Sequence, residues 1–582
     1  MKHLYYLLLV AMIGFASCHQ DIFEDSEMYQ QVDFIIGTAP FDAPIESLYG
    51  DDMTLGNRLE NPYSVVNMRR AYDSMVPELS DAGLEADDIT TTHFYVKFKP
   101  DNEEELQSIK DSYAAFDIYE YPLDYEMSGR VSYHDPEIPD SLPTYQYASI
   151  DSLSWNTIPV PQNVEFEILE RLFIPDEDIY GSNISMQSRA SSSYNDAIEA
   201  LVNRSLLLTG NLDDEDIAEN GTMASNSAWY PSGRITAYDD IVGGQIPLEG
   251  VKVRVRRWFT TSTATTDEDG CFTIPKSFKN KVNYLIVWEG PKWNIRDGLI
   301  AQAYYNGPKK EGAWNLEIAN DSNKSIRYAT IHRAIYRVKL GNTYGLSRIQ
   351  ASYTTNIGYM HKYHPECMGR YKWETTRDTF TDIEIYGKRQ TEEFCEIHYL
   401  LANTYHELGH AAHFTNKRSQ YIDSNVNLRD TWACFVAYYL SLKEYIELGN
   451  PSGPFDSYTI NLNDLSTITY NEPDEINRQL TEIVSTDRYF PLFIDLNDSQ
   501  NQRVLYDYYD LAQYYDREKL PNDCIKAIPA EVIENFVFNS TTILQTKTKL
   551  RGFCARNSVL MNSWYGLSEE TINLMYELYE GL

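Results

Sequence analysis

The sequence contains little cysteine and no paired cysteine motif. Seven of its 582 residues are cysteine, and no two of them form a C-x-x-C pair. So few cysteines in a chain of this length exclude a disulfide-stapled scaffold, because such scaffolds are small and dense in cysteine. Cys18 is followed by six others, most of which we predict to pack as small apolar residues: Cys271, Cys367, Cys395, Cys434, Cys524 and Cys554.

Basic residues are scarce as well. Lys and Arg together number 49 against 86 Asp and Glu, which gives a formal net charge of −37 at pH 7. Proteins bind nucleic acid largely because their basic residues neutralise phosphates and release the bound counterions. A negatively charged surface cannot do this, so we exclude nucleic acid as a partner. The same charge opposes electrostatic binding to anionic lipid headgroups, and it carries no information about the fold.

Long hydrophobic runs are missing after the N-terminus. The apolar run from Leu4 to Ala16, preceded by Lys2, is too short to span a bilayer and is typical of a targeting segment. It ends in Phe15-Ala-Ser-Cys18, small residues before a cysteine, which resembles a bacterial lipoprotein signal. The resemblance implies that Cys18 is lipidated and becomes the mature N-terminus. An ordinary secretory signal is the alternative.

The residues after Cys18 indicate the side of the membrane. Asp21, Glu24 and Asp25 follow closely, as in surface-exposed lipoproteins of some Gram-negative bacteria. This likeness implies a lipid-anchored protein of the bacterial outer membrane that faces the cell exterior.

The chain has enough apolar material for several cores. Hydrophobic residues make up 43% of it and aromatic residues 13%, and the length predicts more than one domain. We therefore expect an α+β multidomain protein. Its expected parts are a signal peptide (1–18), a tether (19–44), an N-terminal α/β or β-rich module of unknown role (45–180), a linker and helix (181–230), a β-sandwich (231–310) and a mainly helical domain (325–582).

The N-terminal module carries one clear strand followed by a helix. Residues 93–99 alternate like a strand. Asp101 and Glu104 then predict a capping box at the start of a helix. His93 and His134 could be ligands, but lone histidines are usually structural, and we interpret both in that way.

The segment around residue 250 is distinctly β. Val251, Val253 and Val255 alternate with basic residues, and a turn at 266–270 leads into a further strand. The run PLEGVKV…TTDEDGCFTI, within roughly residues 232 to 300, resembles the carboxypeptidase regulatory-like sandwich, a transthyretin- or immunoglobulin-like fold. Such sandwiches are often found beside secreted peptidase domains, so the resemblance implies that the same chain also contains a peptidase domain.

The rest of the chain is organised around residues 404–413, which read Thr-Tyr-His-Glu-Leu-Gly-His-Ala-Ala-His. Apolar residues at helical spacing predict a helix from Thr391 to Phe414. On that helix His406 and His410 lie one turn apart on the same face, where two imidazoles can hold one Zn²⁺. Glu407 follows the first histidine and can accept a proton from a water on the metal.

This pattern must be weighed against a plain solvated helix. Its flanks are Leu, Ala and Tyr rather than charged residues, so its polar groups would be costly to bury without a partner. Glu392 and Glu393 are expected in the first turn, where the helix dipole favours negative charge, and residues 379–386 alternate like a strand. The stretch resembles the H-E-x-x-H motif of the zincin metallopeptidases, which implies a zinc site on a helix beside a strand.

A zincin needs a third protein ligand, and Asp430 is the candidate on a second predicted helix from Leu428 to Leu448. Its position resembles the gluzincin arrangement, in which a carboxylate from a second helix completes the metal shell. The usual residue there is Glu, so the shorter Asp is a departure. Alternatively, if Asn427 caps this helix, Asp430 occupies the capping-box position and only caps its own helix.

His413 competes for the same role. It lies about 10 Å along the helix axis from His406, so one straight helix cannot easily offer all three histidines. The metzincin pattern H-E-x-x-H-x-x-G-x-x-H does not fit, because His413 stands in place of the glycine and Asn416 in place of the last histidine. We interpret His413 as a packing, metal-supporting or substrate-facing residue.

Two hypotheses of function follow. The first is an exported, lipid-anchored zinc metallopeptidase that hydrolyses peptide bonds, with His406, His410 and Asp430 as metal ligands and Glu407 as general base. The second is an inactive zincin-like surface lipoprotein that binds peptides, glycans or a protein partner. The shorter third ligand and the lack of any histidine after His413 motivate the second hypothesis.

Overall fold

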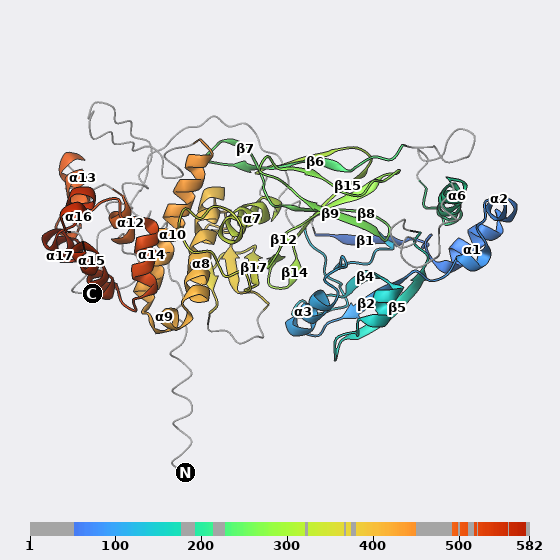
Figure 1. Ribbon diagram of the computed structural model, residues 1–582, viewed down its shortest axis with the longest axis horizontal. Helices are drawn as coiled ribbons and strands as arrows, with labels where there is room; N and C mark the ends of the chain where they lie inside the picture. Colours follow the sequence, from blue (N-terminus) through green and yellow to red (C-terminus); the bar gives the residue numbers. More distant parts are fainter. Residues whose placement is uncertain are drawn as a thin grey trace, which may run out of the picture.

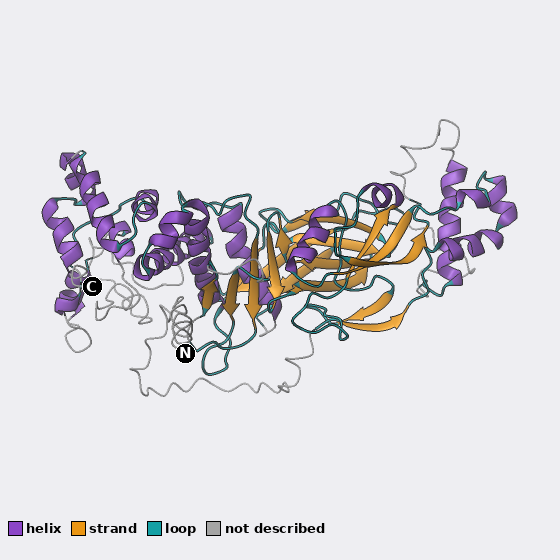
Figure 2. Ribbon diagram, turned by 90° about the horizontal axis from the view of Figure 1, so that it is seen from below, coloured by secondary structure: helices purple, strands orange, loops and turns teal. Residues whose placement is uncertain are grey.

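The computed structural model describes residues 52–175, 192–212, 227–320, 324–365, 368–373, 380–449, 492–498, 501–509, 517–520, 522–556 and 558–577. The expected signal peptide with Cys18, the tether and most of the linker at 181–193 lie outside these residues. Within them the fold is α+β, as predicted. Figures 1 and 2 show an elongated molecule with its sheets in the middle and helices gathered at both ends.

The N-terminal module is built on a three-stranded antiparallel sheet in the order β4-β2-β5. The central strand spans residues 93–99, as predicted. The next helix, α3, is capped by the side chain of Asn102, which accepts from the Glu105 amide, so the predicted Asp101 capping box is wrong. The elements are β1 (Thr54–Arg58), α1 (Val65–Asp73), α2 (Val76–Asp81), β2 (His93–Lys99), α3 (Glu103–Ser112), β3 (Tyr125–Ser128), β4 (Gln146–Asp151), α4 (Ser152–Thr157), β5 (Glu165–Leu172) and α6 (Ser192–Leu208).

The sandwich consists of two four-stranded sheets. One has the order β10-β6-β16 with β7 paired to β6, and the other has the order β15-β11-β8-β9. Val251, Val253 and Val255 are buried in the core that the two sheets share. The strands are β6 (Ser232–Asp239), β7 (Gly244–Pro247), β8 (Lys252–Arg257), β9 (Thr260–Thr265), β10 (Cys271–Thr273), β11 (Val282–Val287), β15 (Tyr304–Lys310) and β16 (Trp314–Ile318).

The opposite face of β8 is buried too, although it carries basic residues. Arg254 lies under the N-terminal module, where its Nη2 is 2.7 Å from Asp117 Oδ1 and its guanidinium lies over the ring of Tyr119. Arg256 donates to the backbone oxygen of Leu123 at 3.1 Å. Buried guanidinium groups are stable only when paired in this way, so these contacts fix the N-terminal module against the sandwich.

A mixed six-stranded sheet follows, and its strands come from both sides of the boundary expected at residue 310. Its order is β12-β13-β17-β19-β18, with β14 paired to β13. Strands β13 and β17 run parallel, as do β17 and β19, whereas β18 is antiparallel to β19 at the sheet's edge. The strands are β12 (Glu289–Gly290), β13 (Trp293–Asp297), β14 (Ala301–Gln302), β17 (Thr355–Met360), β18 (Gly369–Tyr371) and β19 (Ile383–Tyr386).

Helices α7 and α8 pack against this sheet, and further helices continue from them to the far end of the molecule (Figure 1). The central pair is α8 (Ile397–Asn416) and α10 (Val426–Glu447), which lie side by side. The other helices are α7 (Lys324–Lys339), α9 (Arg418–Asp423), α12 (Leu492–Asn497), α13 (Gln502–Tyr509), α14 (Ala530–Phe538), α15 (Ile543–Ala555), α16 (Ser558–Tyr565) and α17 (Glu569–Tyr576).

Helix α8 begins later than the sequence predicts. Glu392 and Glu393 precede it, and Glu392 has a positive φ of 65° that no helix accommodates. The negative charge at the helix start is instead supplied by Asp240, from the turn after β6, whose carboxylate accepts from the amides of Ile397 and His398 at 2.7 and 3.2 Å. The sandwich therefore holds the N-terminus of the helix that bears the H-E-x-x-H motif.

Several smaller predictions have clear outcomes. Cys395, Cys434 and Cys554 are buried as expected, whereas Cys271 and Cys524 are exposed and Cys367 lies outside the described residues. The turn at 266–270 is a tight one, closed by hydrogen bonds from the amides of Asp269 and Cys271 to Asp267 Oδ1. Among the described helices, none combines the length and apolar character needed to cross a membrane.

Candidate metal centre

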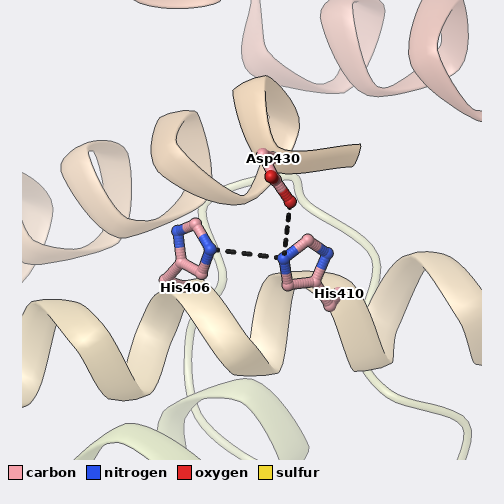
Figure 3. A group of neighbouring side chains, drawn as sticks. All are labelled: His406, His410 and Asp430. Carbon is pink, nitrogen blue, oxygen red and sulfur yellow. Dashed lines mark hydrogen bonds and ion pairs between the residues drawn. The ribbon is translucent and has the colours of Figure 1, made fainter. Parts of the chain in front are cut away.

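Three predicted metal ligands converge between α8 and α10. His406 and His410 project from α8 toward α10, and Asp430 projects back from α10, as Figure 3 shows. The Nε2 atoms of the two histidines lie 3.2 Å apart, and Asp430 Oδ1 lies 3.5 Å from His410 Nε2. One ligand atom from each residue lies within 4.8 Å of the others. All three side chains are buried, with exposed fractions of 7%, 2% and 3%.

These spacings suit one zinc ion. Zn–N bonds of about 2.0–2.1 Å in a tetrahedral shell place neighbouring ligand atoms about 3.3 Å apart. The distances of 3.2 Å and 3.5 Å fall on either side of that value. The donor set of two imidazoles and one carboxylate is also the kind that leaves a fourth position for water or substrate.

Asp430 does not cap its own helix. The N-cap of α10 is Asn425, whose side chain accepts from the Leu428 amide at 3.0 Å, so the alternative in which Asn427 caps the helix is wrong. Helix α10 begins two residues earlier than expected, which puts Asp430 beyond the capping-box position and on the face toward α8. The alternative explanation for this carboxylate is thereby removed.

The protonation of the histidines favours a metal. Burial lowers the pKa of His406 to about 4. Burial also lowers the pKa of His410 well below its usual value, and the nearby positive charge of Arg429 adds to the effect. Both imidazoles are therefore neutral near pH 7, which is the form that binds metal ions.

The sequence reasoning missed the groups that surround these ligands. Tyr421 on α9 has its Oη 3.2 Å from His410 Nδ1, and Cys434 on α10 has its Sγ 3.7 Å from His406 Nδ1. The ring of Tyr371 from β18 is nearly parallel to that of His410, at 6.5 Å between centroids. Such neighbours orient ligating imidazoles. No local pattern marks them, because each comes from another element.

Glu407 lies against the edge strand β18. The structure buries this side chain, and a Cβ added at Gly369 would lie 2.7 Å from Glu407 Oε1 and 2.8 Å from its Cγ. Only glycine leaves room for the carboxylate at this point. The glycine in this short strand is therefore a sequence signal for the close approach of β18 to Glu407. The signal can be recognised only when the position of the strand in the fold is known.

His413 does not join the ligands. Its ring stacks on Phe538 of α14, with centroids 4.5 Å apart and an interplanar angle of 7°, and meets the edge of Tyr421. It is fully buried, and burial together with the charge of Arg429 lowers its pKa to about 3. Three roles were considered for His413 from the sequence, and these contacts agree with a role in packing.

A buried charge network holds the two central helices together. Tyr405, next to His406 on α8, donates to Glu444 of α10. Glu444 Oε1 in turn accepts from Arg333 of α7 at 3.1 Å, and Arg333 donates to Asp239 of β6 at 2.8 Å. Because the partners of these charges come from three helices and the sandwich, the network fixes the relative position of the elements that carry the ligands.

His332 on α7 has a structural role. Its Nε2 lies 2.9 Å from the backbone oxygen of Glu249, and its ring packs against Trp288, Trp293 and Tyr336. Within the N-terminal module, His93 Nδ1 lies 3.0 Å from Thr92 Oγ1, and His134 Nε2 lies 3.0 Å from the backbone oxygen of Ile138.

Comparison with models of protein families, with curated proteins and with solved structures finds no match to this chain.

Proposed function

We propose that this protein is a zinc metallopeptidase of the zincin type, exported and anchored to the outer membrane through a lipid on Cys18. The observation that carries the proposal is the buried group of His406, His410 and Asp430, with Glu407 on the same helix. A buried cluster of two neutral imidazoles and a carboxylate is costly without a cation to share. Metal binding offsets that cost.

Each residue then has a defined task. A zinc ion bound by His406, His410 and Asp430 would supply a Lewis acid that polarises a peptide carbonyl and makes water acidic near neutral pH. Glu407 accepts the proton of the attacking water and delivers it to the leaving amine. Burial of the site excludes bulk water, which strengthens these electrostatic effects.

The position of the edge strand β18 is consistent with a peptide as the substrate. Among the strands that the structure describes, it is the last in the order of its sheet, and it lies beside Glu407. An extended peptide can pair with the free edge of a strand through main-chain hydrogen bonds. Such pairing would bring a scissile bond next to the general base.

The alternative is an inactive binding protein built on the same fold. Asp430 is shorter than the glutamate of the gluzincins, and no histidine follows His413 in the sequence to stabilise an oxyanion. A protein of this kind would keep the buried cluster and bind peptides, glycans or a partner without cleaving them.

Hydrolysis of a broad peptide library, with zinc content measured on the same preparations, separates the two. We expect the wild type to carry one zinc ion per chain and to cleave the library. Glu407→Gln should keep the zinc and lose turnover by at least about a hundredfold, the scale of general base catalysis. Glu396→Gln, an exposed glutamate just before the same helix, is the matched control and should behave as wild type.

His406→Ala completes the design. It should lose both the zinc and the turnover. A wild-type protein that binds zinc through His406 but cleaves nothing in the library would support the binding alternative. Turnover that is equal in wild type and Glu407→Gln would refute the mechanism.

A further inference from the structure

The guanidinium of Arg429 lies beside the metal ligands. This residue immediately precedes Asp430 on α10. Its guanidinium carbon is 5.1 Å from the centre of the Tyr421 ring, and the hydroxyl of the same tyrosine is 3.2 Å from His410 Nδ1. The guanidinium also lies over the ring of Trp373 at 5.0 Å, two residues after β18 ends. Arg429 is therefore close both to the metal ligands and to the end of the edge strand.

Arg429 has no partner of opposite charge. In the part of the chain that the structure describes, its side chain forms no ion pair and no hydrogen bond. The fully buried arginines differ, because Arg254, Arg296 and Arg333 each lie 2.7 or 2.8 Å from a carboxylate. Arg429 is half-buried, so its guanidinium loses part of its hydration without gaining an anion in return. The arrangement favours an anion supplied by another molecule.

The accessible side of this guanidinium matches a carboxylate. Of its three nitrogens only Nη1 is buried, and Nε and Nη2 keep contact with solvent. These two form the side of a guanidinium that can hold both oxygens of one carboxylate. The same chain makes this contact elsewhere, because Arg517 Nε and Nη2 each lie 2.7 Å from an oxygen of Asp507. The two aromatic rings hold Arg429 in position before a ligand arrives, which favours binding.

The charges of the site add up to one uncompensated cation. A bound zinc ion would carry two positive charges, which the carboxylates of Asp430 and Glu407 balance. Burial lowers the pKa of both His406 and His410, so the imidazoles are neutral near pH 7 and add no charge. Arg429 then contributes a positive charge that no ion pair among the described residues compensates. One anionic group beside the metal ligands would complete this balance.

The substrate itself can bring that group. Peptides carry their negative charge as carboxylates, at the C-terminus and on aspartate and glutamate side chains. Gly369 adjoins Glu407 and Trp373 adjoins Arg429, four positions apart, and a peptide extended along β18 advances at the same rise per residue. We propose that Arg429 binds a carboxylate of the substrate within about four residues of the scissile bond. The inference rests on the proposed function, because it takes a peptide as the ligand.

The test is retention of peptides by the full chain, loaded with zinc and carrying Glu407→Gln so that bound peptides are not cleaved. Random N-acetylated octapeptides are offered as free acids and as C-terminal amides, and the retained peptides are sequenced by mass spectrometry. We expect them to be enriched at least tenfold in carboxylates. Enrichment of free acids over amides identifies the C-terminus as the source. Enrichment of aspartate and glutamate at one position, in acids and amides alike, identifies a side chain.

Variants assign the enrichment to Arg429. Arg429→Gln in the same protein should abolish the preference and keep one zinc ion per chain. Arg429→Lys should retain only part of it, because an ammonium keeps the charge without the two-point contact. The matched control is Arg418→Gln, at an exposed arginine that lies over Phe414 at 5.1 Å, and it should keep the full preference. If Arg429 only packs on its aromatic neighbours, Arg429→Gln lowers the thermal midpoint and leaves the preference intact, which would overturn the proposal.

Parallel measurement of wild-type turnover separates this inference from the proposed peptidase. Retention that depends on Arg429, in a protein whose wild type cleaves nothing, would refute the peptidase and leave the carboxylate site standing. Cleavage by the wild type without any preference for carboxylates would overturn the carboxylate site alone. Retention of no peptide, or of peptides without carboxylate enrichment, would overturn it as well.

Discussion

Tyr421→Phe tests whether His410 is a metal ligand held in place by its neighbours. The change removes one oxygen, 3.2 Å from His410 Nδ1, and keeps the ring that packs against Phe414 and His413. If His410 binds zinc through Nε2, its Nδ1 carries the proton and donates it to Tyr421 Oη. Loss of that acceptor frees the imidazole to rotate and leaves a buried N–H unpaired.

The size of the effect follows from that single hydrogen bond. Removing a group that orients a ligating histidine lowers metal affinity by about 10- to 100-fold, which corresponds to about 1.4–2.7 kcal/mol. We expect Tyr421→Phe to fall in this range. The fold should persist, because the aromatic contacts of the ring remain.

The assay is competition for zinc against a coloured chelator of known affinity. The matched control is Tyr439→Phe, which removes the hydroxyl of another tyrosine, one that donates to the Tyr344 oxygen at 3.1 Å. The control should lose about 1 kcal/mol of stability and keep its zinc affinity. If Tyr421→Phe binds zinc as tightly as the wild type, then His410 is not a ligand oriented by Tyr421 and the proposed coordination is wrong.

Three further experiments test other parts of the structure. Asp430→Ala should lower zinc affinity sharply with the fold intact, whereas Asn425→Ala should cost about 1 kcal/mol of stability with the zinc retained; zinc titration and urea unfolding of both variants check this. Gly369→Ala should displace the Glu407 carboxylate and reduce peptide turnover about 10- to 100-fold at unchanged zinc content, as steady-state kinetics would show. Burial lowers the pKa of His332 to about 4 in the folded state, so the unfolded chain binds more protons between pH 6.5 and 4, and stability should fall by about 3 kcal/mol as the pH drops through that window. Urea unfolding at a series of pH values should show a shallower decline in His332→Phe.

The sequence predicted what depends on spacing along one helix. His406 and His410 share a face because four residues make about one helical turn, and this holds wherever the helix lies. Asp430 could be nominated, but its distance from His410 depends on how α10 packs on α8. Tyr421 and Gly369 could not be found, since β18 and α9 approach the site only in the folded chain.

Errors in the sequence reasoning occurred where partners come from distant segments. Glu392 and Glu393 looked like the acidic first turn of α8, yet Asp240, more than 150 residues earlier in the sequence, supplies that charge. The alternation of valines with basic residues also does not reveal that the N-terminal module covers the basic face and pairs Arg254 with Asp117. Local sequence patterns predict where a helix or strand forms. They do not predict which of its surfaces is covered by another part of the fold.

The order in which the chain visits its sheets interleaves the sandwich with the mixed six-stranded sheet. The chain leaves the sandwich after β11, contributes β12 to β14 to the mixed sheet, and returns for β15 and β16 before α7 begins. A fragment starting at residue 325 would lack β13 and would expose the edge of β17, which is prone to aggregation. The sandwich and the mixed sheet therefore have to be expressed together as one unit.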